Sequence, residues 1–390
     1  MGVNMNINDL LKIAIENDAS DLHLKVGNYP ILRISGKLKP LTNLNKLTAD
    51  DTKALSEQIT TDFHKEILKK NLDVDLAYSV AGFGRFRGSI YRQRGSLAIV
   101  LRIIPLQVES IPDLLLPDII KSIAMESRGL VLVTGTTGSG KSTTLASMID
   151  HINSNRSVNI ITIEDPIEYL HRDKRSMINQ REVGSDVIGF AHGLRASLRE
   201  DPDVILVGEM RDHDTIETAL LAAETGHLVL STVHTLDAPE TINRIVTVFA
   251  PHHHKQVRLQ LASILKAVIS MRLIPKKEGE GRVPAVEVMI NTPYIAECIT
   301  NKDKTNLIRD AISSGVSQYN MQTFDQSIYH LFQKGYISYD QGMQFSTSPD
   351  QFKLRVIGIQ STSDLAKEDM EKTLKSFKES NAKIPKDKPE

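Results

Sequence analysis

The sequence has almost no cysteine and almost no excess of charge of either sign. Its 390 residues include one cysteine, Cys298, which excludes an internal disulfide and a zinc site built from four thiolates. Lysine and arginine number 47, against 48 aspartates and glutamates, so the formal net charge is -1. This balance gives no support for binding nucleic acid or anionic lipid over a broad surface. We therefore expect no nucleic-acid partner.

Long hydrophobic runs are also absent. The longest, such as GLVLVTG at 129–135 and DVILVGEM at 203–210, have the length of a strand and are far too short to cross a membrane. The first residues lack the charged start and the continuous apolar core of a secretion signal. The sequence therefore predicts a cytoplasmic protein whose contact with a membrane comes through partners.

The first 105 residues have the pattern of a small α+β domain. Apolar residues at helical spacing predict one helix over 7–18 and further helices over 48–71. Alternating apolar and polar residues, with glycine or proline between the runs, predict short antiparallel strands. These strand-like runs are 20–27, 30–38, 74–80, 84–95 and 96–105.

The rest of the chain has a different pattern. Prolines at 105, 112 and 117 indicate that 106–118 is a linker. Residues 119–359 alternate strand-like runs with amphipathic helices, which predicts a wound α/β sheet. Helices are expected to predominate from Pro251 to about Gly335, interrupted by one hairpin at 282–291. The charged segment 360–390 is expected to be a disordered tail.

The stretch GTTGSGKS at 135–142 matches the phosphate-binding loop G-x-x-x-x-G-K-[ST], and it lies between a strand-like and a helix-like run, as that motif requires. The glycines allow a turn that points backbone N–H groups at phosphate oxygens, and the following helix adds its N-terminal partial charge. Lys141 is expected to reach the β- and γ-phosphates of ATP, and the Ser142 hydroxyl to bind Mg²⁺. The predicted nucleotide-binding residues of this loop are Gly135, Thr136, Thr137, Gly138, Ser139, Gly140, Lys141, Ser142 and Thr143.

Two acidic residues follow apolar runs further along the chain. Glu164 ends one run, just before Asp165 and Pro166, and Glu209 ends DPDVILVGE. Because the carboxyl ends of parallel strands share one sheet edge, both carboxylates are expected to face the γ-phosphate. Hydrolysis needs one acid to order water and another to hold the metal. Either acid could instead only cap the next helix or turn.

Two histidines also have either a functional or a structural interpretation. The run TGHLVLSTVHT predicts a third strand, with His227 at its start and His234 at its end. A histidine at the nucleotide edge can sense the γ-phosphate, although a single histidine more often has a structural role. The three rings of PHHHKQ at 251–256 point in different directions on a helix, which favours a solvated helix start over a metal site.

Arginines gather in the segment 84–105. Spacing alone favours a solvated basic strand face, and the alternative is that some of them reach a neighbouring subunit's nucleotide as arginine fingers. The five are Arg85, Arg87, Arg92, Arg94 and Arg102.

Four stretches resemble, in order and spacing, the motifs of the type II/IV secretion ATPase superfamily. GTTGSGKSTT, TIEDPIEY, LRASLREDPDVILVGEMRD and AAETGHLVLSTVHT are similar to its Walker A, Asp box, Walker B and His box. DASDLHLKVGNYPILRISGKL near the start and NMQTFDQSIYHLFQKGYISYDQG near the end resemble the PilT-like branch, the type IV pilus retraction ATPases. The resemblance extends from about Asn6 to Ile359.

This resemblance implies the α/β fold of a RecA-like P-loop ATPase domain, preceded by a small α+β PAS-like domain at 1–105. It also implies a homohexameric ring in which Arg87 and Arg102 of one chain act on the nucleotide of the next. Glu164 would activate the attacking water, and Glu209 would act on Mg²⁺ through a water. His234, with His227 behind it, would form the His-box pair.

The function implied is ATP hydrolysis that powers pilus retraction, and thereby twitching motility. The partners implied are an inner-membrane pilus platform protein, where this chain would be peripheral, and a paralogous retraction ATPase. A pilus assembly or type II secretion ATPase is a further alternative. Such proteins usually carry a four-cysteine motif and additional N-terminal domains, whereas this sequence has one cysteine and a single short N-terminal domain, so this alternative is disfavoured. An accessory, PilU-like retraction ATPase remains an alternative, with Asp201 as evidence against it.

Overall fold

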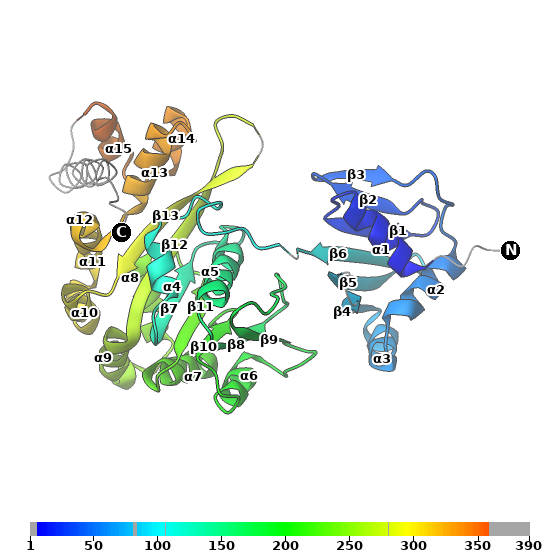
Figure 1. Ribbon diagram of the computed structural model, residues 1–390, viewed down its shortest axis with the longest axis horizontal. Coiled ribbons are helices and arrows are strands. Elements are labelled where there is room, and N and C mark those ends of the chain that lie inside the picture. Colours follow the sequence, from blue (N-terminus) through cyan, green and yellow to red (C-terminus); the bar gives the residue numbers. More distant parts are fainter. Residues whose placement is uncertain (1–5, 81–83, 106, 280, 359–390) are drawn as a thin grey trace, which may run out of the picture. The chain divides into compact units, whose positions relative to one another are not determined.

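The computed structural model describes residues 6–80, 84–105, 107–279 and 281–358. The chain divides into two compact units between Gln107 and Val108, and Glu168–Leu170 is assigned to the first unit. Each unit has its own sheet and its own hydrophobic core (Figure 1). The predicted tail, 360–390, lies outside the described residues.

The first unit is a six-stranded antiparallel sheet covered by helices, in the order β3-β2-β1-β6-β5-β4. Leu11 of the first helix packs with Leu22 and Phe86 of the sheet in a buried core. All helices and strands predicted for this segment are present, and 30–38 contributes to a hairpin of two strands. Its elements are α1 (Ile7–Glu16), β1 (Asp21–Lys25), β2 (Ile31–Ile34), β3 (Lys37–Pro40), α2 (Ala49–Ile59), α3 (Asp62–Asn71), β4 (Asp73–Val80), β5 (Gly84–Gln93) and β6 (Ser96–Ile104).

The second unit is built on a seven-stranded sheet, in the order β13-β12-β7-β11-β10-β8-β9. All neighbours are parallel except β12 and β13. Its elements up to the end of the sheet are α4 (Ile119–Ala124), β7 (Gly129–Thr134), α5 (Lys141–Asn155), β8 (Asn159–Glu164), β9 (Met177–Glu182), α6 (Phe190–Ser197), β10 (Val204–Val207), α7 (His213–Glu224), β11 (Leu228–Val233), α8 (Ala238–Thr247), η1 (Pro251–His253), α9 (His254–Ile264), β12 (Leu265–Pro275) and β13 (Arg282–Ile290).

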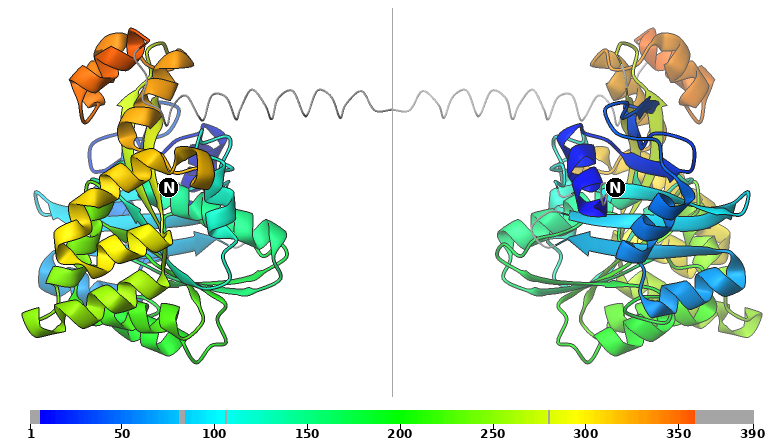
Figure 2. Two further views of the ribbon diagram at one scale, coloured as in Figure 1. Left: turned by 90° about the vertical axis from the view of Figure 1, so that its left-hand side faces the viewer. Right: turned by 90° about the vertical axis from the view of Figure 1, so that its right-hand side faces the viewer.

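Helices cover both faces of this sheet (Figure 2). Every residue of β7 and β11 is buried, as expected for the central strands of a parallel sheet. Along β7, Leu130 and Leu132 enter the core that contains α6–α9, whereas Val131 and Val133 enter the core that contains α4 and α5. Alternate side chains of β7 therefore pack against the helices on opposite faces of the sheet.

Short helices complete the second unit. Around Phe352, which is fully buried, Tyr329, Phe332 and Tyr339 form a cluster of aromatic rings that holds α13, α14 and α15 together. The helices are α10 (Pro293–Thr300), η2 (Lys302–Leu307), α11 (Ile308–Ser314), α12 (Val316–Tyr319), α13 (Phe324–Gln333), α14 (Tyr339–Phe345) and α15 (Pro349–Val356).

Two sequence predictions need correction. The segment Leu265–Pro275, expected within a helical region, is β12, the long partner of β13. Its run of apolar residues is buried on both faces, so it shows no period of two by which a strand could be recognised. The predicted linker is partly packed, because Ile111 and Leu116 lie in the core of the second unit. Within the ranges described, no helix has the length and apolarity needed to cross a bilayer.

A matched pair of glycines tests the packing of β7. Gly129 has φ +114°, and a Cβ there would lie 2.6 Å from the Ile264 carbonyl oxygen, whereas Gly226 has φ +111° and nothing within 4 Å of its Cβ position. Both changes to alanine carry a backbone cost of about 1–3 kcal/mol, and G129A adds a clash. We expect thermal unfolding to give a Tm for G129A several degrees below that of G226A. Equal losses would show that β7 and Ile264 move apart at no cost.

Candidate active site

The predicted phosphate loop lies between β7 and α5. Gly135, Gly138 and Gly140 have φ values of +143°, +76° and +98°. At Gly135 a Cβ would lie 2.4 Å from the Ser139 Oγ and 2.6 Å from the Met271 carbonyl oxygen. The loop therefore needs glycine at this position for both its backbone angle and its close packing.

Lys141 begins α5 and is 8% exposed. Its Nζ donates hydrogen bonds to the carbonyl oxygens of Gly135 and Thr136, both at 2.9 Å. The ammonium group is thus held within the turn of the loop. Ser142 follows it in the first turn of the same helix.

Glu164, Glu209 and His234 lie at the carboxyl ends of three strands parallel to β7. Glu164 is the last residue of β8, Glu209 follows β10 by two residues, and His234 directly follows β11. Thr134 is paired with Val233 in the register of β7 and β11, so the phosphate loop and His234 leave the sheet side by side. The structure therefore brings these predicted residues to one edge of the sheet.

Glu209 and His234 are in contact at this edge. The Glu209 Oε2 forms an ion pair with Arg211 Nε at 2.8 Å and lies 3.4 Å from His234 Nε2. Burial lowers the pKa of His234, and the charges of Lys141 and Arg211 lower it further. Glu209 opposes these effects without cancelling them, so His234 is neutral at pH 7.

Glu164 is held by two side chains that the sequence analysis missed. Its Oε1 accepts hydrogen bonds from Thr162 Oγ1 at 2.6 Å and from Gln180 Nε2 at 3.1 Å. The Gln180 Oε1 in turn accepts a hydrogen bond from the backbone N–H of His171 at 2.9 Å. Two-residue spacing on β8 could have indicated Thr162. Nothing in the sequence indicates Gln180, because its position depends on the pairing of β8 with β9.

His227 lies elsewhere in the second unit. It precedes β11, whereas His234 follows it, and a strand of this length separates the two by roughly 20 Å. The His227 Nδ1 is 2.9 Å from the Ala222 carbonyl oxygen, and its own carbonyl accepts the Gly129 N–H. Within one chain the structure does not bring His227 to the phosphate loop.

Arg87 and Arg102 lie in the first unit, directly opposite each other on β5 and β6. The same row continues through Asp21 to Arg33, so three arginines and one aspartate share a face. Asp21, a residue not predicted, has a 6% exposed side chain, and its Oδ1 accepts Arg102 Nε at 2.9 Å. The Arg102 side chain itself is 67% exposed.

The pKa of Asp21 reflects these contacts. Burial raises it, but the hydrogen bond from Ser20 and the contact with Arg102 outweigh burial, so the net shift is downward. Asp21 is therefore ionised at neutral pH and orients Arg102 through Nε.

No group of three or more metal-ligating side chains (His, Cys, Asp or Glu) occurs in the part of the chain that the structure describes. This includes the histidines of 252–254, of which His252 and His253 have ring centroids 4.1 Å apart. Ser142 and Glu209 are oxygen donors of the kind that Mg²⁺ accepts, and Mg²⁺ in proteins usually has only one or two side-chain ligands besides phosphate and water. The residues present therefore fit a metal that binds together with nucleotide.

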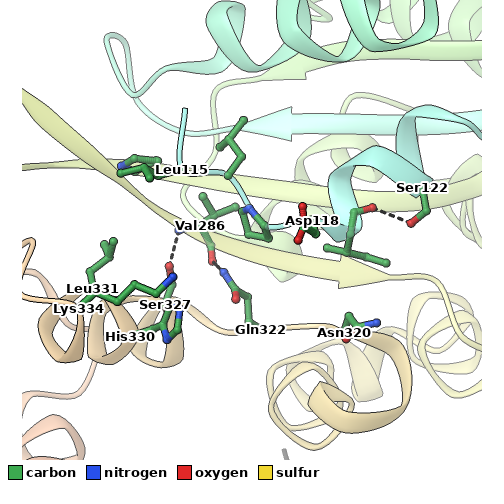
Figure 3. A pocket seen from close by; sticks show the side chains of 14 residues that line it. Leu115, Asp118, Ser122, Val286, Asn320, Gln322, Ser327, His330, Leu331 and Lys334 are labelled. Carbon is green, nitrogen blue, oxygen red and sulfur yellow. Dashed lines mark hydrogen bonds between the residues drawn. The ribbon is translucent and has the colours of Figure 1, made fainter. Parts of the chain in front are cut away.

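A pocket of about 560 Å³ lies in the second unit between the segment before α4, β13 and α13 (Figure 3). The Ser327 Oγ accepts the Val286 N–H at 3.0 Å, and Gln322 Nε2 donates to the Val286 carbonyl oxygen at 2.7 Å. The phosphate loop and the three strand-end residues do not line it. The pocket is therefore separate from the candidate active site.

Comparisons with known proteins agree with this architecture. The type IV pilus retraction ATPase PilT of Pseudomonas aeruginosa is 44% identical over 348 residues, which cover 89% of this chain and all of that protein. The type IV pilus ATPase PilU of the same organism is 36% identical and covers 92% of this chain, and 94% of PilU is covered. A crystal structure of the pilus retraction motor PilT with bound ADP has a TM-score of 0.82 at 46% identity, covering 89% of this chain and 98% of that one.

The predicted fold class, a RecA-like ATPase domain after a small N-terminal domain, is confirmed by this structural match. The family model described as "Type II/IV secretion system protein" matches residues 2–326. The chain therefore belongs to the type II/IV secretion system protein family, in its PilT-like branch.

Proposed function

We propose that this chain is the ATP-hydrolysing motor that retracts a type IV pilus. One observation carries the proposal: a phosphate loop, Glu209 and His234 meet at one sheet edge, in a chain of which 89% matches the full length of a pilus retraction ATPase. The accessory, PilU-like role is the alternative, and the lower identity of 36% to PilU disfavours it.

In this proposal the loop residues bind the phosphates of ATP. The N–H groups of the glycine-rich turn face phosphate oxygens, and Lys141 exchanges its two loop carbonyls for the β- and γ-phosphates. Mg²⁺ would neutralise charge on these phosphates, with the Ser142 hydroxyl and, through water, Glu209 as its protein ligands.

The strand-end residues then have separate roles. Glu164 accepts the proton of the attacking water, because it ends β8 at the same sheet edge as the phosphate loop and Thr162 and Gln180 orient it through Oε1. Neutral His234 donates its Nε2–H to Glu209 or to a phosphate oxygen, and a change of partner would make it sensitive to the γ-phosphate.

We further infer that six copies form a ring, in which Arg87 and Arg102 act on the nucleotide of the neighbouring chain. The guanidinium of Arg102 supports this role because Asp21 binds it through Nε while its side chain remains 67% exposed. Domain rotations driven by hydrolysis would act on an inner-membrane platform protein from the cytoplasmic side, together with a paralogous retraction ATPase.

The first test is a strain that lacks only this gene. We expect abundant surface pili and lost surface spreading, because assembly continues without retraction. The wild-type gene and the control E217Q, a change on the exposed face of α7, should restore spreading, and E209Q should not. Cells without pili would assign the chain to assembly, and normal spreading would assign it an accessory role.

The support of Glu164 gives a second test. We expect Q180L to lower kcat for ATP hydrolysis about 10- to 100-fold with KM changed less than about twofold, because a misplaced base slows chemistry more than binding. The matched control is Q260L, which removes an equivalent hydrogen bond to Glu224 between α9 and α7. Equal rates in both variants would remove Gln180 from the mechanism.

Mixing of subunits tests the action of Arg102 on a neighbour. R102A and E209Q are each expected to lose at least about tenfold in kcat. Rings mixed from the two should regain activity, since some interfaces then pair an intact Arg102 with an intact Glu209. The control is R92A: Arg92 lies on β5 of the same sheet, and this variant should keep wild-type activity without mixing. Mixed rings no faster than the separate variants would show that Arg102 does not act in trans.

A further inference from the structure

Glu287 is a buried acid that none of the roles above uses. It lies in the middle of β13, is 4% exposed, and is flanked by the buried residues Val286 and Val288. Its Oε1 accepts the N–H of Ala238 at 3.1 Å and lies 3.4 Å from the donor Oγ of Ser270, its cross-strand partner on β12. A carboxyl group in such a position needs these partners to offset its loss of hydration.

Its main partner belongs to the turn that carries His234. Ala238 is the first residue of α8, four residues after His234. Asp237, the N-cap of this helix, accepts the Glu240 N–H through one carboxylate oxygen and binds Arg309 of α11 through the other. The turn 234–238 is therefore held by its own helix, by β13 and by α11.

Charged groups reach Glu287 from each element around it. Asp237 is on α8, Arg309 on α11 and Arg272 on β12, while Asp325 of α13 interacts with both arginines. Burial raises the pKa of Glu287 to about 7, and Asp237 adds to this rise. The Ala238 N–H and the two arginines oppose it. Glu287 therefore changes charge close to neutral pH.

We propose that Glu287 is a positioning residue for His234, which fixes the turn 234–238 through the Ala238 N–H and joins it, with Asp237 and Arg309, to the helices after the sheet. The inference rests on the proposed function, because its effect is measured as ATP hydrolysis. An ionised carboxylate accepts a stronger hydrogen bond than a neutral one. The turn is therefore held more firmly when Glu287 is ionised.

The test is the dependence of kcat on pH. We expect the rate of the wild-type protein to rise through an inflection near pH 7, and E287Q to lose this inflection while keeping its maximal kcat within about threefold. Glutamine keeps the size of the side chain and an acceptor for Ala238, but it does not titrate. The control E297Q changes an exposed glutamate of α10, and its profile should match the wild type. An inflection near pH 7 that persists in E287Q would overturn the proposal.

A second pair of variants separates positioning from general stability. E287L removes the acceptor, and we expect kcat to fall about tenfold with nucleotide affinity changed less than about twofold. In the H234A background the same change should have no further effect on kcat, because Glu287 acts through His234. Additive losses would contradict the inference. They would leave the proposed function intact as long as hydrolysis still depends on Glu209, whereas hydrolysis independent of Glu209 would overturn both.

Thermal unfolding checks the charge change without any hydrolysis. The pKa of Glu287 is raised from 4.5 to about 7 on folding, so the folded state binds more protons between these values and is destabilised as the pH rises. The Tm of E287Q minus that of the wild type should therefore grow from pH 5 to pH 7.5. A constant difference would show that Glu287 is ionised throughout, which excludes it as the source of an inflection near pH 7.

Discussion

The register between β7 and β11 is the constraint on which the candidate active site depends. Thr134 lies opposite Val233, so the next residues of the two strands, Gly135 and His234, leave the sheet together. The parallel pairing of β10 and β8 on the far side of β11 brings Glu209 and Glu164 to the same edge.

Once gathered, the charges at this edge influence one another. Burial, and then the charges of Lys141 and Arg211, lower the pKa of His234, and Arg211 also pairs with the Glu209 carboxylate. Glu164 accepts hydrogen bonds from Thr162 and Gln180. The site therefore contains two acids in different surroundings, Glu209 beside Arg211 and His234, and Glu164 hydrogen-bonded to the neutral side chains of Thr162 and Gln180. Different surroundings are what allow two carboxylates to take different roles in one reaction.

The support of the site extends beyond its edge. The turn after His234 is anchored by β13 and α11, the elements that follow the parallel strands in the chain. In the first unit a buried aspartate similarly holds an exposed arginine, since Asp21 orients Arg102 across neighbouring strands. In both places a buried carboxylate holds a residue, or the turn that follows one, to which we assign a role at the nucleotide.

Local patterns in the sequence were enough to predict the phosphate loop, the acids at the strand ends and nearly all elements of the first unit, because glycine spacing, strand alternation and motif order are local properties. Three features depended on the tertiary structure. Strand β12 has no recognisable period because both of its faces are buried, and Gln180 reaches Glu164 only through the pairing of β9 with β8. His227 and His234 share a motif, yet a fully extended strand carries them to opposite ends of the sheet. Motif membership is a property of the chain, whereas proximity is a property of the fold.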